Sequence, residues 1–239
     1  MSEPISHRMS SHKYAWVIPF ACLLVGGVFL GVSTNLAKFA VEIGLTPLAY
    51  LFWSIAGAAI ILSMVALLRQ DTLPLSARSL EYYVFAALVS VAGSNLIFFS
   101  AIPHVGAGFV ALIISLPPLL TYLAALVIKI ERFSILRALG VVAALAGAGL
   151  LAARKFAAPD ASLFWILLAL CGPVLLAIGN IYRSLRWPAN ASAIALAPGM
   201  LIAAALMLAA VALFPDFSLV VPYQSALPLV LILLQAGIF

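Results

Sequence analysis

Charged residues are scarce in this 239-residue sequence: Asp, Glu, Lys and Arg together make up 8% of it. An average soluble domain is roughly a quarter charged and about half apolar. Here 66% of the residues are hydrophobic and the mean hydropathy is +1.25. So few charges cannot cover the surface of a soluble globule. The composition excludes a soluble domain and a disordered chain, and it predicts a polytopic membrane protein.

Cysteine and histidine are also rare, with two and three residues. This excludes a disulfide scaffold, and no zinc-type Cys/His spacing occurs. Cys22 and Cys171 fall inside apolar stretches, where we interpret them as small packing residues. No basic run is interleaved with aromatic residues for base stacking, so Lys and Arg in cytoplasmic loops better explain the net charge of +5. We expect no cofactor, no metal and no nucleic-acid partner.

What the sequence has instead is a series of long uncharged runs. A spanning helix needs about 20 mostly apolar residues. The run 82–128 is too long for one helix, so we divide it at the turn 103–106 into spans three and four. The fifth span, 138–153 with an extension from Ile135, is rich in glycine (Gly140, Gly147, Gly149), which predicts close packing against its neighbours. The other spans are 14–37, 43–68, 161–182 and 192–214, and an eighth begins at 228.

The last run, 228–239, is shorter than the others. At a rise of 1.5 Å per residue it reaches roughly 18 Å, against a hydrocarbon core of about 30 Å. We therefore expect the sequence to stop inside a helix.

Lys and Arg are distributed unevenly among the predicted loops. Nine lie in the N-terminal tail and in the loops after spans two, four and six, against three on the other side. This asymmetry predicts a cytoplasmic N-terminus. The loops are too short to house a soluble domain, so any function must lie within the helix bundle.

A shift of 145 residues overlays the second half of the sequence on the first. Asn35 then meets Asn180, Lys38 meets Arg183, and the run 54–68 meets 199–213. A repeat of five spans is odd-numbered, so its second copy would lie upside down in the membrane. Two inverted units around one cavity are the arrangement that supports alternating access. Chance agreement between apolar segments is the alternative.

Several stretches of the sequence together form a recognisable family pattern. The strongest is SAIPHVGAGFVALIISLPPLL at 100–120, followed by IERFS at 130–134 and the glycine-rich fifth span. Two further stretches belong to the pattern: GVSTN at 31–35 with Lys38, and AIGNIYR at 177–183. This pattern resembles the drug/metabolite transporter superfamily, specifically its EamA-type ten-helix carriers. The resemblance implies an all-α polytopic transmembrane helix bundle of inverted five-helix repeats, with no catalytic signature.

The resemblance also implies a division of the chain and shows two departures. Residues 1–13 would be a cytoplasmic tail, 14–155 a first five-helix repeat, and 156–239 a second repeat truncated in its eighth helix. Ser54 stands where the family often has Arg, which weakens the case for anion binding there. Ile130 replaces the usual Gly before Glu131.

Polar and aromatic groups within the membrane are costly, so they mark candidate contacts with a solute. No Asp or Glu lies deep in a predicted span, which argues against proton coupling through a carboxylate. The alternatives are interhelical hydrogen bonding for the Ser, Thr and Asn residues, snorkelling for Lys38, and packing or lipid contact for Trp53. We interpret Tyr82, Tyr83 and Trp187 as interfacial. The candidates for the transport pathway are Thr34, Asn35, Lys38, Trp53, Ser94, Asn95, Phe98, Ser115, Asn180 and Tyr182.

Prolines inside the predicted spans free backbone carbonyls and bend helices. We consider them as hinges, with a static kink as the alternative reading. The hinge candidates are Pro117, Pro118, Pro173 and Pro198.

Three functions compete on this evidence. The first is a secondary active transporter, with efflux as the expected direction, for small organic metabolites such as amino-acid-like solutes in a bacterial cytoplasmic (inner) membrane. The second is a non-transporting membrane scaffold or assembly subunit. The third, an intramembrane enzyme, lacks a Ser/His pair, buried paired carboxylates or a metal cluster. Beyond the solute, the partners expected are the lipid bilayer and, as an open alternative, further copies of the chain.

Overall fold

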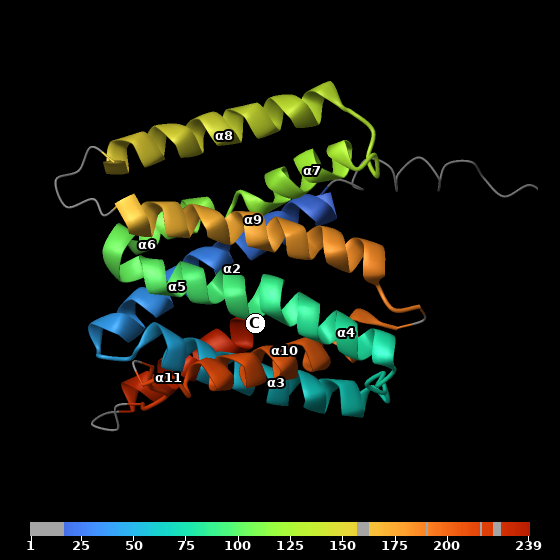
Figure 1. Ribbon diagram of the computed structural model, residues 1–239, viewed down its shortest axis with the longest axis vertical. Coiled ribbons are helices and arrows are strands. Elements are labelled where there is room, and N and C mark those ends of the chain that lie inside the picture. The colour runs from blue at the N-terminus through green and yellow to red at the C-terminus, as the bar shows by residue number, and fades with distance from the viewer. Residues whose placement is uncertain (1–16, 157–162, 190, 216, 222–225) are drawn as a thin grey trace, which may run out of the picture.

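A computed structural model of the chain describes residues 17–156, 163–189, 191–215, 217–221 and 226–239 (Figure 1). The side chains at 17–19, 148, 151, 152 and 154–156 fall outside that description, as do the predicted tail 1–13 and the first residues of the predicted first span. The described residues form helices and loops and contain no strand. The elements are α2 (Val17–Glu42), α3 (Pro47–Leu68), α4 (Ala77–Ala86), the π-helix η1 (Ala87–Gly93), α5 (Ser94–Val105), α6 (Ala107–Ile113), α7 (Pro117–Val127), α8 (Ile135–Phe156), α9 (Leu163–Arg186), α10 (Ala193–Val211) and α11 (Leu227–Ile238).

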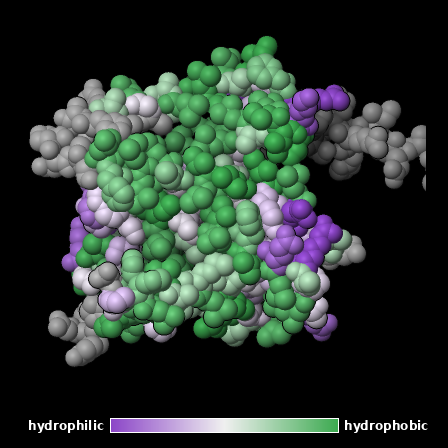
Figure 2. Space-filling view, viewed as in Figure 1, coloured by the Kyte–Doolittle hydropathy of each residue, from purple (hydrophilic) through white to green (hydrophobic). Residues whose placement is uncertain are grey.

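Six segments are long and apolar enough to cross a membrane. Their outer faces carry large exposed apolar side chains, such as Leu67 and Leu206, and Figure 2 shows an apolar surface between two polar ends. A helix satisfies its backbone hydrogen bonds internally, as the hydrocarbon core of a bilayer requires, so apolar helices of this length are suited to span a membrane. The structure therefore confirms a polytopic bundle with predicted spans one to four, six and seven. The six segments are Phe20–Glu42, Pro47–Leu68, Ala77–Val105, Ala107–Val127, Leu163–Arg186 and Ala193–Val211.

Local signals in the sequence set the ends of these helices. Thr46 caps α3, accepting a hydrogen bond from the Ala49 amide, and Pro47 occupies the first turn, where its missing N–H costs nothing. Ser192 caps α10 in the same way. Gly106 has φ +88°, a backbone conformation that favours glycine, and it separates α5 from α6 within the turn predicted at 103–106.

The fourth span is interrupted rather than merely bent. Helix α6 ends at Ile113 and α7 begins at Pro117, with three residues of turn between them. Pro117 and Pro118 supply no N–H to the carbonyls four residues earlier, so the helical hydrogen bonding stops there. Pro173 and Pro198 are buried inside α9 and α10, which run on without a break.

The third span contacts α9 and α10 closely because three glycines on those helices leave room for its side chains. It is a single 29-residue segment, Ala77–Val105, built from α4, η1 and α5. A Cβ added at any of the three glycines would overlap a side chain of this span. We call these the glycine contacts: Gly172 with Phe98, Gly179 with Ser90, and Gly199 with Tyr83.

Helix α8 departs from the prediction of close packing. It lies along one edge of the bundle (Figure 1), where it touches α6 and α9 through few residues. Cβ atoms added at Gly140, Gly147 or Gly149 would meet nothing within 4 Å. These three glycines therefore make no close contact with the other described residues, and their prediction as a packing surface was wrong.

Two other sequence interpretations are corrected by burial. Tyr82 and Tyr83 are 1% and 4% exposed and lie in a small aromatic cluster between α4, α9 and α10, so their rings face other helices and do not form a lipid-facing aromatic belt. Cys22 and Cys171 are exposed on the outer faces of α2 and α9 and do not pack in the interior. In both cases hydropathy identified the span but not the side of the helix that faces inward.

The helices that the 145-residue overlay pairs, α2 with α9 and α3 with α10, run in opposite directions. In Figure 1, α2 and α10 run from right to left, whereas α3 and α9 run from left to right. Helices α3 and α10 lie side by side and form the most extensive helix pair in the bundle.

Candidate functional site

A cavity of about 400 Å³ lies between α2, α5, α9 and α11, and the exposed side chains of Phe29 and Leu30 form part of its wall. Ser33 and Leu176, from the middle parts of α2 and α9, line it, so it lies near the middle of the membrane. Its wall is mostly apolar and aromatic with three polar side chains, a composition typical of small-molecule sites. The lining residues are Gly26, Phe29, Leu30, Ser33, Asn95, Phe98, Phe99, Ile114, Leu176, Gln235, Ile238 and Phe239.

Gln235 is the most deeply buried polar group of this wall, with no exposed surface. Its Oε1 accepts a hydrogen bond from the Tyr50 hydroxyl at 3.1 Å, and its Nε2 donates one to Ser33 Oγ at 2.8 Å. This chain of hydrogen bonds joins α3, α11 and α2. Because buried polar groups without partners destabilise a protein, the chain fixes the orientation of the Gln235 amide at the cavity.

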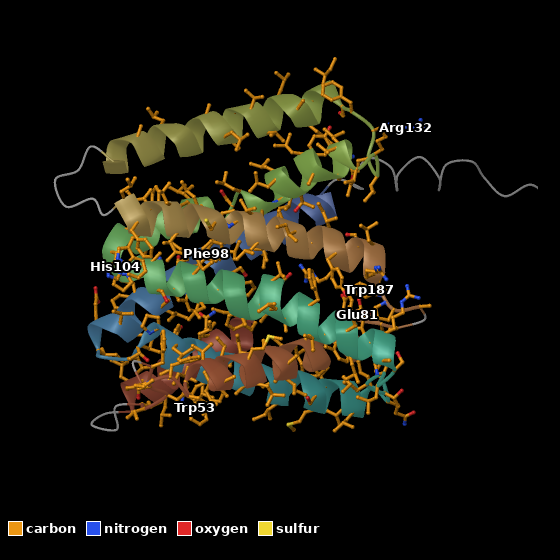
Figure 3. The ribbon with its side chains drawn as sticks, viewed as in Figure 1. Trp53, Glu81, Phe98, His104, Arg132 and Trp187 are labelled. Carbon is orange, nitrogen blue, oxygen red and sulfur yellow. The ribbon has the colours of Figure 1, made fainter. Side chains whose placement is uncertain are left out.

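The aromatic part of the wall comes mainly from α5. Phe98 is 1% exposed and lies between α5 and α9 (Figure 3), where Gly172 leaves room for its ring. Phe99 contacts Tyr50, with ring centroids 5.7 Å apart. Asn95, one helical turn before Phe99, lines the same cavity and donates a hydrogen bond from Nδ2 to the Val91 carbonyl. Its amide oxygen makes no hydrogen bond within the described part of the chain.

The structure brings two of the predicted transport residues, Asn95 and Phe98, into this cavity. Four others hydrogen-bond to carbonyls three or four residues earlier in their own segment, which is the behaviour of Ser, Thr and Asn in a static helix. Of these, Thr34 and Ser94 are buried and Asn35 and Ser115 are exposed. The donor–acceptor pairs are Thr34–Gly31, Asn35–Gly31, Ser94–Ser90 and Ser115–Leu112.

Lys38 and Trp53 lie away from the cavity. Helix α2 continues past Lys38 to Glu42, and the two side chains form an exposed ion pair at 3.6 Å. Trp53 is 43% exposed, and its indole N–H donates to the Leu219 carbonyl in the loop before α11. His104, at the same end of the bundle, stacks on Trp165 with ring centroids 3.7 Å apart.

Asn180 and Tyr182 lie toward the other end of α9. Asn180 donates a hydrogen bond to Thr121 Oγ1 at 3.3 Å and accepts one from Arg183. It lines a second pocket, of about 510 Å³, formed between α7 and α9. Tyr182 contacts Phe85 and stacks on Tyr82.

Sequence reasoning missed Gln235 and Ser33. Gln235 is the only polar residue of α11, and a single amide in an apolar helix is a signal that could have identified it. Ser33 adjoins the predicted candidates Thr34 and Asn35, but it faces the interior whereas Asn35 faces outward.

The spanning helices and the cavity at mid-membrane depth define a multi-pass integral membrane protein. The model of the EamA-like transporter family matches residues 17–153. This match covers more than half of the sequence, and the chain belongs to that family. The match runs from α2 to the last turn of α8, and the division of the chain into repeats at 155 stays a prediction. No curated protein matches the chain.

Among the described residues, no group of three or more His, Cys, Asp and Glu side chains is arranged to hold a metal ion. The polar groups of the mid-membrane cavity are a hydroxyl and two amides, all uncharged. They can donate and accept hydrogen bonds at once, so they suit amide, amine or carboxylate groups of a solute.

Proposed function

We propose that the protein is a secondary active transporter that exports small organic metabolites, including amino-acid-like solutes, by alternating access across a bacterial inner membrane. The mid-membrane cavity carries this proposal. It is large enough for a small metabolite, it lies between helices of both halves of the chain, and it combines aromatic rings with uncharged polar groups. Membership of a transporter family supports the same conclusion.

The two halves, 14–155 and 156–239, would act as inverted repeats. The opposite directions of α2 and α9, and of α3 and α10, support this (Figure 1). The hydrogen bonds of Gln235 to Tyr50 and Ser33 cross from one half to the other. Movement of one half relative to the other would have to break and re-form these hydrogen bonds. The state of the cavity would therefore be coupled to the side of the membrane on which it opens. The break before Pro117 adjoins the cavity at Ile114 and is the hinge candidate best placed for this movement.

Counterflow in proteoliposomes tests the proposal. A panel of radiolabelled amino acids and related metabolites is offered to protein-containing vesicles preloaded with the same unlabelled solute. We expect at least one solute to accumulate transiently above protein-free vesicles. Asn95→Ala should reduce that flux about two- to tenfold, because it removes a neutral hydrogen-bonding group from the cavity wall.

Asn35→Ala is the matched control, since its amide bonds to its own helix on an exposed face. Its flux should stay within about twofold of the wild type. Solute binding without counterflow would support a scaffold instead of a transporter. Equal loss of flux in both variants would contradict the proposal that the solute passes through this cavity.

The proposed orientation places the N-terminus in the cytoplasm. Arg132 and Trp187 lie at one end of the bundle and His104 at the other (Figure 3). With Cys22 and Cys171 replaced by Ser, single cysteines at Arg132 and at His104 can be labelled with an impermeant maleimide in intact cells. We expect labelling at position 104 only, and at position 132 only after the membrane is opened. The reverse pattern would contradict the orientation.

A further inference from the structure

Arg183 is a half-buried cation that lacks an anionic partner. The described residues contain two ion pairs, Lys38–Glu42 and Arg137–Glu131, and neither involves it. Its guanidinium donates a hydrogen bond to Asn180, while its Nε is buried and has no acceptor. A charged donor left without an acceptor out of water is costly. An arginine in this state is therefore well suited to receive an anion.

The pocket beside Arg183 has the shape and chemistry of a binding site. It measures about 510 Å³ and is lined by Pro118, Thr121, Asn180, Arg183, Ser184 and Trp187. Asn180 accepts a hydrogen bond from the guanidinium and donates one to Thr121 Oγ1. A planar guanidinium fixed in this way keeps further N–H groups for a bidentate oxyanion.

A second unpartnered donor lies next to this site. The Tyr82 hydroxyl is buried without a hydrogen-bond partner among the described residues, and the Tyr82 ring stacks on Tyr182, the residue before Arg183. Its ring packs edge-on against Trp187, with centroids 6.1 Å apart. Trp187 is held in place by a hydrogen bond from its indole N–H to the Ala191 carbonyl. Trp187, which contacts Tyr82 and lines the pocket of Arg183, lies at one end of the bundle (Figure 3).

The acidic side chain on the neighbouring helix does not neutralise Arg183. Glu81, on the neighbouring α4, is exposed and forms no ion pair with Arg183. Arg186, one turn further along α9, adds positive charge to the same end of the bundle but does not line the pocket.

We propose that Arg183 is the centre of an oxyanion site that binds the carboxylate of an organic solute, with Trp187 and Pro118 contacting its apolar part. The inference rests on the proposed function, because it assigns a substrate class: carboxylate-bearing metabolites that bind at the Arg183 end before reaching the mid-membrane cavity. A lipid phosphate offers the same oxyanion chemistry. The polar lining from Thr121, Asn180 and Ser184 favours a soluble carboxylate.

Equilibrium dialysis of the purified full chain in a neutral detergent tests the site. The probes are benzoate and benzamide, which have nearly the same shape but differ in charge. Benzoate should bind saturably, and benzamide should not displace it. Arg183→Gln should raise the dissociation constant for benzoate about tenfold or more, as expected for loss of a charge-assisted hydrogen bond. Arg186→Gln, which removes the same charge from the same helix, should change it less than about twofold.

Several results would overturn the proposal. They are absence of saturable benzoate binding to the wild type, equal binding of benzoate and benzamide, and unchanged affinity in the Arg183→Gln variant. The comparison of the two probes needs only the wild-type protein, so it stands even if a variant fails to fold. In nanodiscs, loss of benzoate binding on addition of phosphatidylglycerol to phosphatidylcholine would assign the site to a lipid headgroup and refute the solute proposal.

Binding in detergent involves no flux, so the two proposals fail separately. Benzoate binding without any counterflow would refute transport and keep the site. Counterflow without benzoate binding would refute the site and keep transport.

Discussion

Gly179→Ala is expected to destabilise the bundle by about 1–3 kcal/mol, the usual cost of forcing an extra group into a packed interior. The new methyl group would overlap the Ser90 hydroxyl and press on the Ser90 Cβ and backbone nitrogen. Rotation of the Ser90 hydroxyl relieves only part of this conflict, because the Ser90 Cβ also lies only 3.1 Å from the new methyl group in a closely packed interface. Gly172→Ala should behave alike because its methyl group would overlap the Phe98 ring. The measurement is the midpoint of unfolding by sodium dodecyl sulfate for the protein purified in mild detergent.

Gly147→Ala on α8 is the matched control for these substitutions. A Cβ there meets nothing within 4 Å, and alanine favours a helix over glycine by about 0.5–1 kcal/mol. We expect an unchanged or slightly higher midpoint. Ser90→Ala alone should do no harm because its hydroxyl is buried without a partner. Combined with Gly179→Ala it should recover part of the lost stability. Strictly additive effects would show that Ser90 and Gly179 do not meet.

Gln235→Leu should reduce counterflow by about tenfold or more and should lower stability. The substitution removes the amide from the cavity and leaves the Tyr50 and Ser33 hydroxyls without their partner in a buried place. Each unsatisfied group of this kind costs about 1–3 kcal/mol. Unfolding midpoints and initial counterflow rates, measured on the same preparations, give the two effects.

A second variant separates a structural role from a role in the pathway. Tyr50→Phe combined with Gln235→Leu removes both partners of the buried hydrogen bond, which can be nearly neutral for stability. We expect the unfolding midpoint to return toward the wild-type value while the flux stays low. If flux recovered together with stability, the Gln235 amide would be a structural element and not a contact of the solute.

The spans themselves were predictable because hydrophobicity and charge decide which segments enter lipid. The runs 43–68 and 192–214 contain α3 and α10, and the turn at 103–106 separates α5 from α6. The third span begins earlier than predicted because Arg78 and Glu81 are accommodated in the first turns of α4. Charge at the end of a spanning helix is tolerated near water, so a charge-free criterion cuts such helices short.

The inward faces of the helices were harder to predict. A span that is apolar all round gives no periodic signal for the side that meets its neighbours. For that reason Tyr82 and Tyr83 were assigned to the interface although they are buried, and α8 was assigned to the interior although it lies at the edge. Both errors concern rotation or placement of a helix, which tertiary contacts determine.

The candidate site was predicted only in part for the same reason. Asn95 and Phe98 line the cavity, whereas Asn35, predicted on equal grounds, faces outward. Asn35 and Asn180 correspond in the sequence overlay but have different surroundings, since Asn180 binds Thr121 and Arg183 across helices. The pairing of Gln235 with Tyr50 spans 185 positions in the sequence, and no local pattern contains it.

The glycine contacts restrict how the second half of the chain can move. If α9 slid lengthwise past the third span by one turn, Leu168 or Leu176 would replace Gly172 against the Phe98 ring, and Leu175 or Arg183 would replace Gly179 against Ser90. Neither pair of side chains fits a space that excludes a single methyl group. A piston-like or elevator-like stroke of α9 is therefore blocked at two points. Tilting of α9 about this line of contact would keep each glycine against its partner, so under the proposed transport function we expect access to change by a rocking motion about the third span.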